Sequence, residues 1–208
     1  MNNEDKHNIL RFWFDNLWKW KIDVNLPEEK LKKYKSMPPL ESLWKSEWSE
    51  EFESLCIENK ILWDKKFIKK CKEHLIIGAV RYGLLNSANK PTYDRMESIL
   101  KRIKLYIING NLEYLVDCSN LFLLEYEEGI HPNKHKGKGN FVLGTGQRCA
   151  KVPRLIMNFA NMYKQTGSTL SLAYGFNLCM YEYVKGKHPK RHYSVIYDGS
   201  ETRVKEKK

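Results

Sequence analysis

The chain has 208 residues, of which 42% are hydrophobic and 12% aromatic, so it can bury a core and is not a disordered protein. No apolar run approaches the ~18 residues of a membrane-spanning helix, and the N-terminus has no signal-peptide core, which predicts a cytoplasmic protein with no membrane partner. The scattered cysteines lack a Cys-x-x-Cys pair, which predicts reduced thiols. The net charge of +11 favours a nucleotide, a nucleic acid or an acidic protein as partner, although solubility alone would also explain it.

The N-terminal part predicts a series of helices over residues 1–83. The aromatic segment 9–20 has apolar residues at helical spacing, either for the core or for a partner. Residues 25–37 begin at a capping asparagine and end before two prolines. Further apolar periodicity predicts helices over residues 44–55 and 62–80, the latter ending near Gly83.

A repeat with an offset of 57 positions dominates the rest of the chain. The segment EYEEGIHPNKH at 125–135 returns as EYVKGKHPKRH at 182–192, and the match continues upstream without a gap. Such a match indicates internal duplication. We therefore expect a first helical hairpin repeat at residues 84–136 and a second at 151–193. A Gly/Lys-rich linker at 137–150 would join them, and a basic tail would follow at 194–208.

Each repeat predicts two antiparallel helices. Gly110 or Gly167 supplies the turn, Asn111 or Ser168 caps the second helix, and a glycine at 129 or 186 ends it in the left-handed conformation. The predicted fold is all-α: tandem αα-hairpins that form a helical bundle with an N-terminal helical extension. Only YSVIYD, near the C-terminus, predicts a strand.

The repeated His-Pro-x-x-His phrase places histidines four residues apart. On a helix this spacing suits two metal ligands. A proline after the first histidine instead indicates the start of a new helix, which that histidine would cap. Because the phrase occurs in both repeats, we expect capping and packing rather than zinc binding for His131, His135, His188 and His192.

Four acids occur in the first repeat alone. Asp94 and Glu97 share one helix face, and Glu113 and Asp117 share a face of the next helix. If the hairpin brings the two faces together, the carboxylates need a cation, and Mg²⁺ suits them. The matching positions of the second repeat hold Lys151, Arg154, Leu170 and Tyr174. This difference is expected of one metal site with a degenerate partner, and also of drift at four exposed positions.

The order D-x-x-E, then an acid and Asp on the following helix, resembles the MazG-like all-α nucleotide pyrophosphohydrolases over residues 93–130. The chain departs from that family's pattern in having Asp94 for Glu, and in placing Glu113 four rather than three residues before Asp117. The resemblance implies Mg²⁺-dependent hydrolysis of a nucleoside triphosphate to the monophosphate and pyrophosphate. It implies metal ligands at Asp94, Glu97, Glu113 and Asp117, the last two catalytic, with substrate contacts from Lys101, Arg102 and Asn120.

Other functions stay open. The chain also resembles small uncharacterised bacteriophage proteins, which implies a viral or mobile-element origin and a location in the host cytoplasm. A non-enzymatic basic protein that inhibits a host or defence complex would suit the charge and the aromatic N-terminus, and so would a nucleic-acid binder. A homo-oligomer is compatible with each of these.

Overall fold

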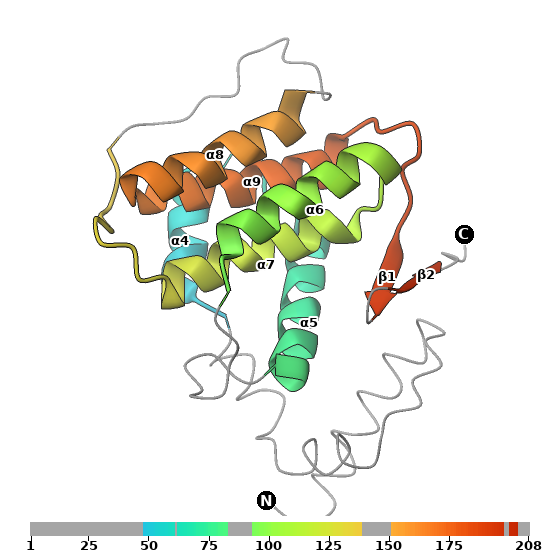
Figure 1. Cartoon of the computed structure of the whole chain (residues 1–208), viewed down its shortest axis with the longest axis horizontal. Coiled ribbons are helices and arrows are strands. Elements are labelled where there is room, and N and C mark those ends of the chain that lie inside the picture. Colours follow the sequence, from blue (N-terminus) through green and yellow to red (C-terminus); the bar gives the residue numbers. More distant parts are fainter. Residues whose placement is uncertain (1–47, 61, 83–92, 139–150, 198–199, 204–208) are drawn as a thin grey trace, which may run out of the picture.

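The computed structural model describes residues 48–60, 62–82, 93–138, 151–197 and 200–203. The expected helices over residues 9–20 and 25–37, and most of the linker and the tail, lie outside them. The described part is all-α, as predicted, with one short antiparallel pair of strands (Figure 1). Its elements are α4 (Glu50–Glu58), α5 (Lys65–Tyr82), α6 (Arg95–Asn109), α7 (Glu113–Glu128), α8 (Val152–Thr166), α9 (Thr169–Lys185), β1 (Ser194–Tyr197) and β2 (Ser200–Arg203).

The described helices lie in three layers. Helices α7 and α9 form the middle layer, with α6 and α8 packed on one side and α4 and α5 on the other (Figure 1). A helix covered on both sides must be apolar around most of its circumference, and every residue of α9 from Thr169 to Met180 is buried. Within the described residues, none of the helices combines the length and apolarity needed to cross a bilayer.

The core is built around aromatic side chains from different layers. Phe176 of α9 makes edge contacts with Phe52 of α4 and Phe67 of α5, with ring centroids 5.6 and 6.3 Å apart. All three rings are at most 1% exposed. Truncating a phenylalanine in such a core costs about 3–5 kcal/mol, so these contacts hold the N-terminal helices against the hairpins.

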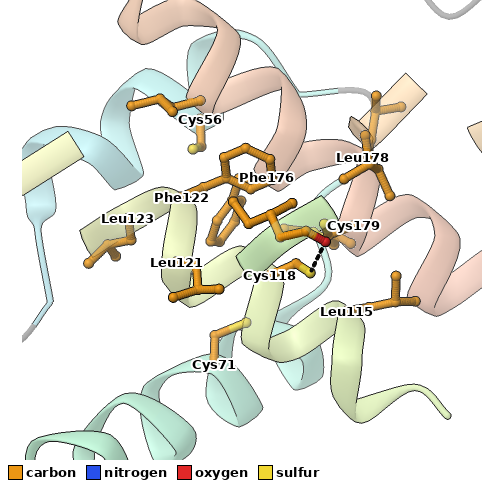
Figure 2. Packing of buried hydrophobic residues seen from close by; sticks show 14 of the residues in the cluster. Cys56, Cys71, Leu115, Cys118, Leu121, Phe122, Leu123, Phe176, Leu178 and Cys179 are labelled. Atoms are coloured by element: carbon orange, nitrogen blue, oxygen red, sulfur yellow. Dashed lines mark hydrogen bonds between the residues drawn. The ribbon is translucent and has the colours of Figure 1, made fainter. Parts of the chain in front are cut away.

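The described cysteines lie in the same core (Figure 2). They are free thiols, as the sequence predicts for this part of the chain. Burial raises the pKa of each thiol well above its ordinary value, so these side chains behave as small apolar groups. They are Cys56, Cys71, Cys118 and Cys179; Cys149 lies outside the described residues.

The hairpin turns follow the sequence prediction. Gly110 and Gly167 have φ angles of 77° and 74°, the left-handed region that favours glycine. A Cβ atom at Gly110 would also lie only 2.3 Å from Nδ1 of His188. The predicted cap at Asn111 is one residue early, because the N-cap of α7 is Leu112, although Asn111 accepts a hydrogen bond from the backbone N–H of Glu113 (3.1 Å). Ser168 is the N-cap of α9, as predicted, but its side chain makes no capping bond.

Two predicted features of the helix ends are wrong. Gly129 and Gly186 do end α7 and α9, but with φ angles of −64° and −59°, outside the left-handed region. The His-Pro-x-x-His segments also start no helix: residues 131–138 form a turn and an extended loop. The loops are ordered instead by hydrogen bonds to the other hairpin.

The first loop, residues 131–135, caps the C-terminal end of α8. Nδ1 of His131 accepts from the backbone N–H of Asn133 (3.1 Å), so Nε2 carries the proton and donates to the carbonyl of Lys164 (3.1 Å). The backbone N–H of His135 donates to the carbonyl of Gly167 (3.1 Å). Carbonyls that the end of α8 leaves without helical partners are satisfied in this way.

The second loop, residues 188–192, makes the same bonds to α6. Nδ1 of His188 accepts from the N–H of Lys190 (3.1 Å), and Nε2 donates to the carbonyl of Ile107 (3.0 Å). The N–H of His192 donates to the carbonyl of Gly110 (3.2 Å). Each loop therefore caps the first helix of the opposite hairpin.

The equivalence extends to α4 and α5. The amide of Asn120 on α7 donates to the carbonyl of Cys71 on α5 (2.9 Å), and the amide of Asn177 on α9 donates to the carbonyl of Cys56 on α4 (3.0 Å). Such reciprocal contacts are what duplication would produce, and the duplication itself stays an interpretation.

Candidate functional site

Three side chains with metal-ligating atoms converge between α5 and α7. Nδ1 of His74 lies 3.4 Å from Oδ1 of Asp117 and 3.9 Å from Oε1 of Glu113. One ligand atom from each residue lies within 4.8 Å of the other two. The side chains of His74 and Glu113 are only 7% and 5% exposed, whereas that of Asp117 is 30% exposed, so the cluster opens to solvent on the Asp117 side.

Arg102 of α6 contacts this open side. Its Nε donates to Oδ2 of Asp117 (3.3 Å). Burial alone would raise the pKa of Asp117, but the hydrogen bond and charge of His74 and the charge of Arg102 outweigh it and hold the pKa below its ordinary value. Burial would lower the pKa of Arg102, and the charge of Asp117 raises it instead. The two side chains are therefore an ion pair at neutral pH.

Tyr193 contacts the opposite side of the His74 ring. Its hydroxyl oxygen lies 2.7 Å from Nε2 of His74, and the ammonium of Lys70 lies 4.3 Å from the centre of the tyrosine ring. Burial and the charge of Glu113 raise the pKa of Tyr193, which keeps the hydroxyl neutral. A tyrosine that follows the second hairpin thus orients a histidine beside the acids of α7.

The second loop also positions the start of α7. The N–H of Leu112 donates to the carbonyl of His192 (2.9 Å). Asn111 donates to the carbonyl of Ser194 (2.8 Å), and its Oδ1 accepts from the N–H groups of Ser194 (3.0 Å) and Glu113 (3.1 Å). These bonds fix the first turn of the helix that carries Glu113.

The predicted cluster of four carboxylates does not form. Asp94 is the N-cap of α6, where it accepts from the N–H of Glu97 (2.9 Å) and binds the ammonium of Lys164 (3.0 Å). It lies eight residues before Arg102, or about 12 Å along the helix, whereas Asp117 contacts Arg102 directly. The antiparallel hairpin therefore places Asp94 at the other end from the cluster, and among the described residues neither Asp94 nor Glu97 belongs to the group of converging metal-ligating side chains.

The predicted substrate-binding residues have different environments. Arg102 is in contact with the cluster, and Lys101 is exposed on α6. Asn120 is only 6% exposed and bonds to the backbone of Cys71. Its prediction as a substrate contact is wrong, because its amide joins α7 to α5 in the interior.

The alternative of zinc binding by the repeated histidines conflicts with the geometry. Both ring nitrogens of His131 and of His188 are engaged with backbone groups, as described above. The segments are also not helical, so the spacing of four residues does not align the two histidines on one helix face. In this conformation the rings serve as loop supports.

The equivalent position in the second hairpin is apolar. Leu170 stands in place of Glu113, and the ring contact between Phe159 and Tyr174, with centroids 5.3 Å apart, stands in place of the ion pair between Arg102 and Asp117. These three residues are each 7% exposed. Glu113 and its counterpart Leu170 are both buried. The alternative that the acids reflect drift at exposed positions therefore does not apply to Glu113.

His74 and Tyr193 are not among the site residues that the sequence predicts. A weak signal exists: F-x-x-x-C occurs at 52–56 and again at 67–71, and the residue three positions later is Asn59 in one segment and His74 in the other. Tyr193 likewise differs from Lys136, its counterpart after the first loop. His74 and Tyr193 thus each differ from the residue at the matching position, and both lie beside Glu113 and Asp117 or in contact with a residue that does.

Comparison of the chain with protein-family models, with curated proteins and with solved structures finds no match. The resemblance to MazG-like enzymes is thus carried by the acidic motif alone.

Proposed function

We propose that this chain is a divalent-metal-dependent hydrolase of phosphate anhydrides, with a nucleoside triphosphate as substrate. The observation that carries the proposal is the convergence of Glu113, Asp117 and His74 at a half-open position beside Arg102. The proposal keeps the acids of α7 from the sequence-based hypothesis and omits Asp94 and Glu97.

The charges of the cluster favour a bound cation. Carboxylates removed from water are costly unless positive charge compensates them. Arg102 supplies positive charge to Asp117, and a divalent ion held by His74, Asp117 and Glu113 would add positive charge between the two carboxylates. Mg²⁺, the ion that the sequence predicts, is commonly held by one or two carboxylates together with waters and substrate phosphates. When bound, such an ion polarises a phosphoryl oxygen and activates water.

Arg102 has the position of a phosphate-binding residue. Its Nε holds Asp117, and its side chain is 35% exposed, so the terminal N–H groups can reach a substrate at the open side. Guanidinium groups match phosphate oxygens in a planar, two-pronged geometry. The exposed Lys101 on the same helix adds positive charge that attracts an anionic substrate.

A nucleotide hydrolysis assay with a matched control variant tests the proposal. Purified protein is incubated with a panel of nucleoside triphosphates and Mg²⁺ or Mn²⁺, and pyrophosphate release is measured. Asp117→Asn should lower kcat/KM at least about 100-fold. Asp94→Asn, which removes a charge at the far end of α6 but keeps a good cap, should stay within about threefold of the unaltered protein. The proposal is wrong if the unaltered protein hydrolyses none of the nucleotides, or if Asp117→Asn is as active.

A second candidate function, polyanion binding without catalysis, is favoured by exposed lysines on the helices that flank α7. They are Lys65, Lys66 and Lys69 on α5 and Lys101 and Lys104 on α6. Anisotropy titrations with single- and double-stranded DNA at two salt concentrations test it. Affinity that falls steeply with salt would support it, and the absence of binding at low salt would exclude it.

A further inference from the structure

We infer that His74 is the third protein ligand of the metal, oriented by Tyr193, and that the site therefore selects a first-row transition ion such as Zn²⁺ or Mn²⁺ over Mg²⁺. The inference rests on the metal binding in the proposed function, but not on nucleotide hydrolysis.

The separations within the cluster fit a coordination shell. Nδ1 of His74 lies 3.4 Å from Asp117 and 3.9 Å from Glu113. The first distance is that of a long hydrogen bond and the second exceeds hydrogen-bond range, since N–H···O hydrogen bonds prefer 2.7–3.2 Å. Ligand atoms about 2.0–2.1 Å from a tetrahedral ion lie about 3.4 Å from one another. The atoms of His74 and Asp117 thus stand at the spacing of two ligand positions, whereas Glu113, 3.9 Å from His74 and within 4.8 Å of Asp117, would have to move towards the ion to complete the third.

The second nitrogen of His74 has the partner that a ligating histidine requires. Such histidines usually donate their other N–H to an oxygen, which fixes the ring and the tautomer. Here the hydroxyl oxygen of Tyr193 lies 2.7 Å from Nε2. Tyr193 is itself only 7% exposed and is held by the loop that bonds to Asn111 and Leu112. The ring is therefore fixed with Nδ1 directed at the two carboxylates.

The donor set decides between classes of metal ion. Imidazole nitrogen suits Zn²⁺ and other first-row transition ions, whereas Mg²⁺ prefers oxygen ligands in octahedral geometry. One imidazole and two carboxylates leave a further position for water or substrate, as in catalytic zinc sites. That position lies on the side of Asp117 and Arg102, where the cluster is accessible to solvent.

The test is metal binding by the full chain after treatment with a chelator. Calorimetric titrations with Zn²⁺, Mn²⁺ and Mg²⁺ compare the unaltered protein with His74→Gln, Tyr193→Phe and, as a control remote from the site, His131→Gln. We expect one Zn²⁺ per chain, bound at least about 100-fold more tightly than Mg²⁺. His74→Gln should lose most of that preference, Tyr193→Phe should weaken Zn²⁺ binding about 10- to 100-fold, and His131→Gln should leave affinity unchanged.

Pulsed electron paramagnetic resonance of the Mn²⁺-loaded protein reports the ligand directly and needs no variant. Coupling of the ion to an imidazole nitrogen is expected in the unaltered protein, and its absence would overturn the inference even if His74→Gln fails to fold. Equal affinity for Zn²⁺ and Mg²⁺ would also overturn it. Histidine-dependent metal binding without nucleotide hydrolysis would refute the proposed function alone, whereas hydrolysis that His74→Gln leaves intact, with unchanged metal affinity, would refute this inference alone.

Discussion

Replacing His188 with alanine separates support of the fold from support of the site. The side chain makes two hydrogen bonds, to the carbonyl of Ile107 and from the N–H of Lys190, and packs on the ring of Tyr106 with centroids 5.3 Å apart. At about 1 kcal/mol for each bond, His188→Ala should lower the free energy of unfolding by about 2 kcal/mol. For a chain of this length that is a fall in Tm of roughly 4–8 °C.

His131→Ala is the matched control. His131 makes the same two bonds, to Lys164 and from Asn133, and packs on Tyr163 at the same centroid distance of 5.3 Å. Its loop, however, borders the apolar position of the second hairpin. Both variants should lose similar stability in thermal or urea unfolding, but only His188→Ala should also weaken metal binding several-fold, because its loop leads to Tyr193.

Two results would refute this reasoning. Equal losses of metal affinity in the two variants would mean that the loops act through general stability rather than through Tyr193 and the first turn of α7. An unchanged Tm in His188→Ala would mean that the cross-hairpin bonds contribute little in solution.

The remaining predictions concern stability. Asp94→Ala should lower the free energy of unfolding by about 1 kcal/mol at neutral pH, because it removes a helix cap. Hydrogen bonds and Lys164 lower the pKa of Asp94 despite some burial, so this loss should persist down to pH 3.8 and shrink at lower pH. Unfolding measured at several pH values checks this. Gly175→Ala should lower Tm, because the new Cβ would lie 2.3 Å from the ring of Phe122 and overpacking of about 1–3 kcal/mol exceeds the ~1 kcal/mol gained in helix propensity. Gly78→Ala, where nothing lies within 4 Å of the Cβ position, should instead raise it. Burial raises the pKa of Glu182, so the unfolded chain loses this proton more readily and the unaltered protein should lose stability as pH rises above 4.5. The stability of Glu182→Gln relative to the unaltered protein should therefore rise as pH increases from 4.5 towards 7. A stability difference that does not change with pH would contradict the raised pKa of Glu182.

The fold was predictable where local chemistry decides it. Gly110 and Gly167 mark the turns because a left-handed residue is needed there, and apolar periodicity marks the buried faces of the helices. The capping of each hairpin by the other's loop was not predictable, since it depends on backbone hydrogen bonds between segments far apart in the sequence.

The candidate site shows the limit of an argument from helix faces. Spacing fixes the direction of a side chain around the helix axis but not which residues of two neighbouring helices lie at the same height. Glu113 and Asp117, on one helix, do converge, whereas Asp94 lies at the other end of the hairpin from Glu113. His74 belongs to a separate helix, and no spacing rule connects it to α7.

The most direct test of the metal site is a crystal soaked in Zn²⁺ or Mn²⁺, with anomalous diffraction recorded at the absorption edge of the ion. We expect one strong peak within bonding distance of Nδ1 of His74 and of the carboxylates of Glu113 and Asp117. An empty cluster, or a peak at His131 and His135 in its place, would contradict the account.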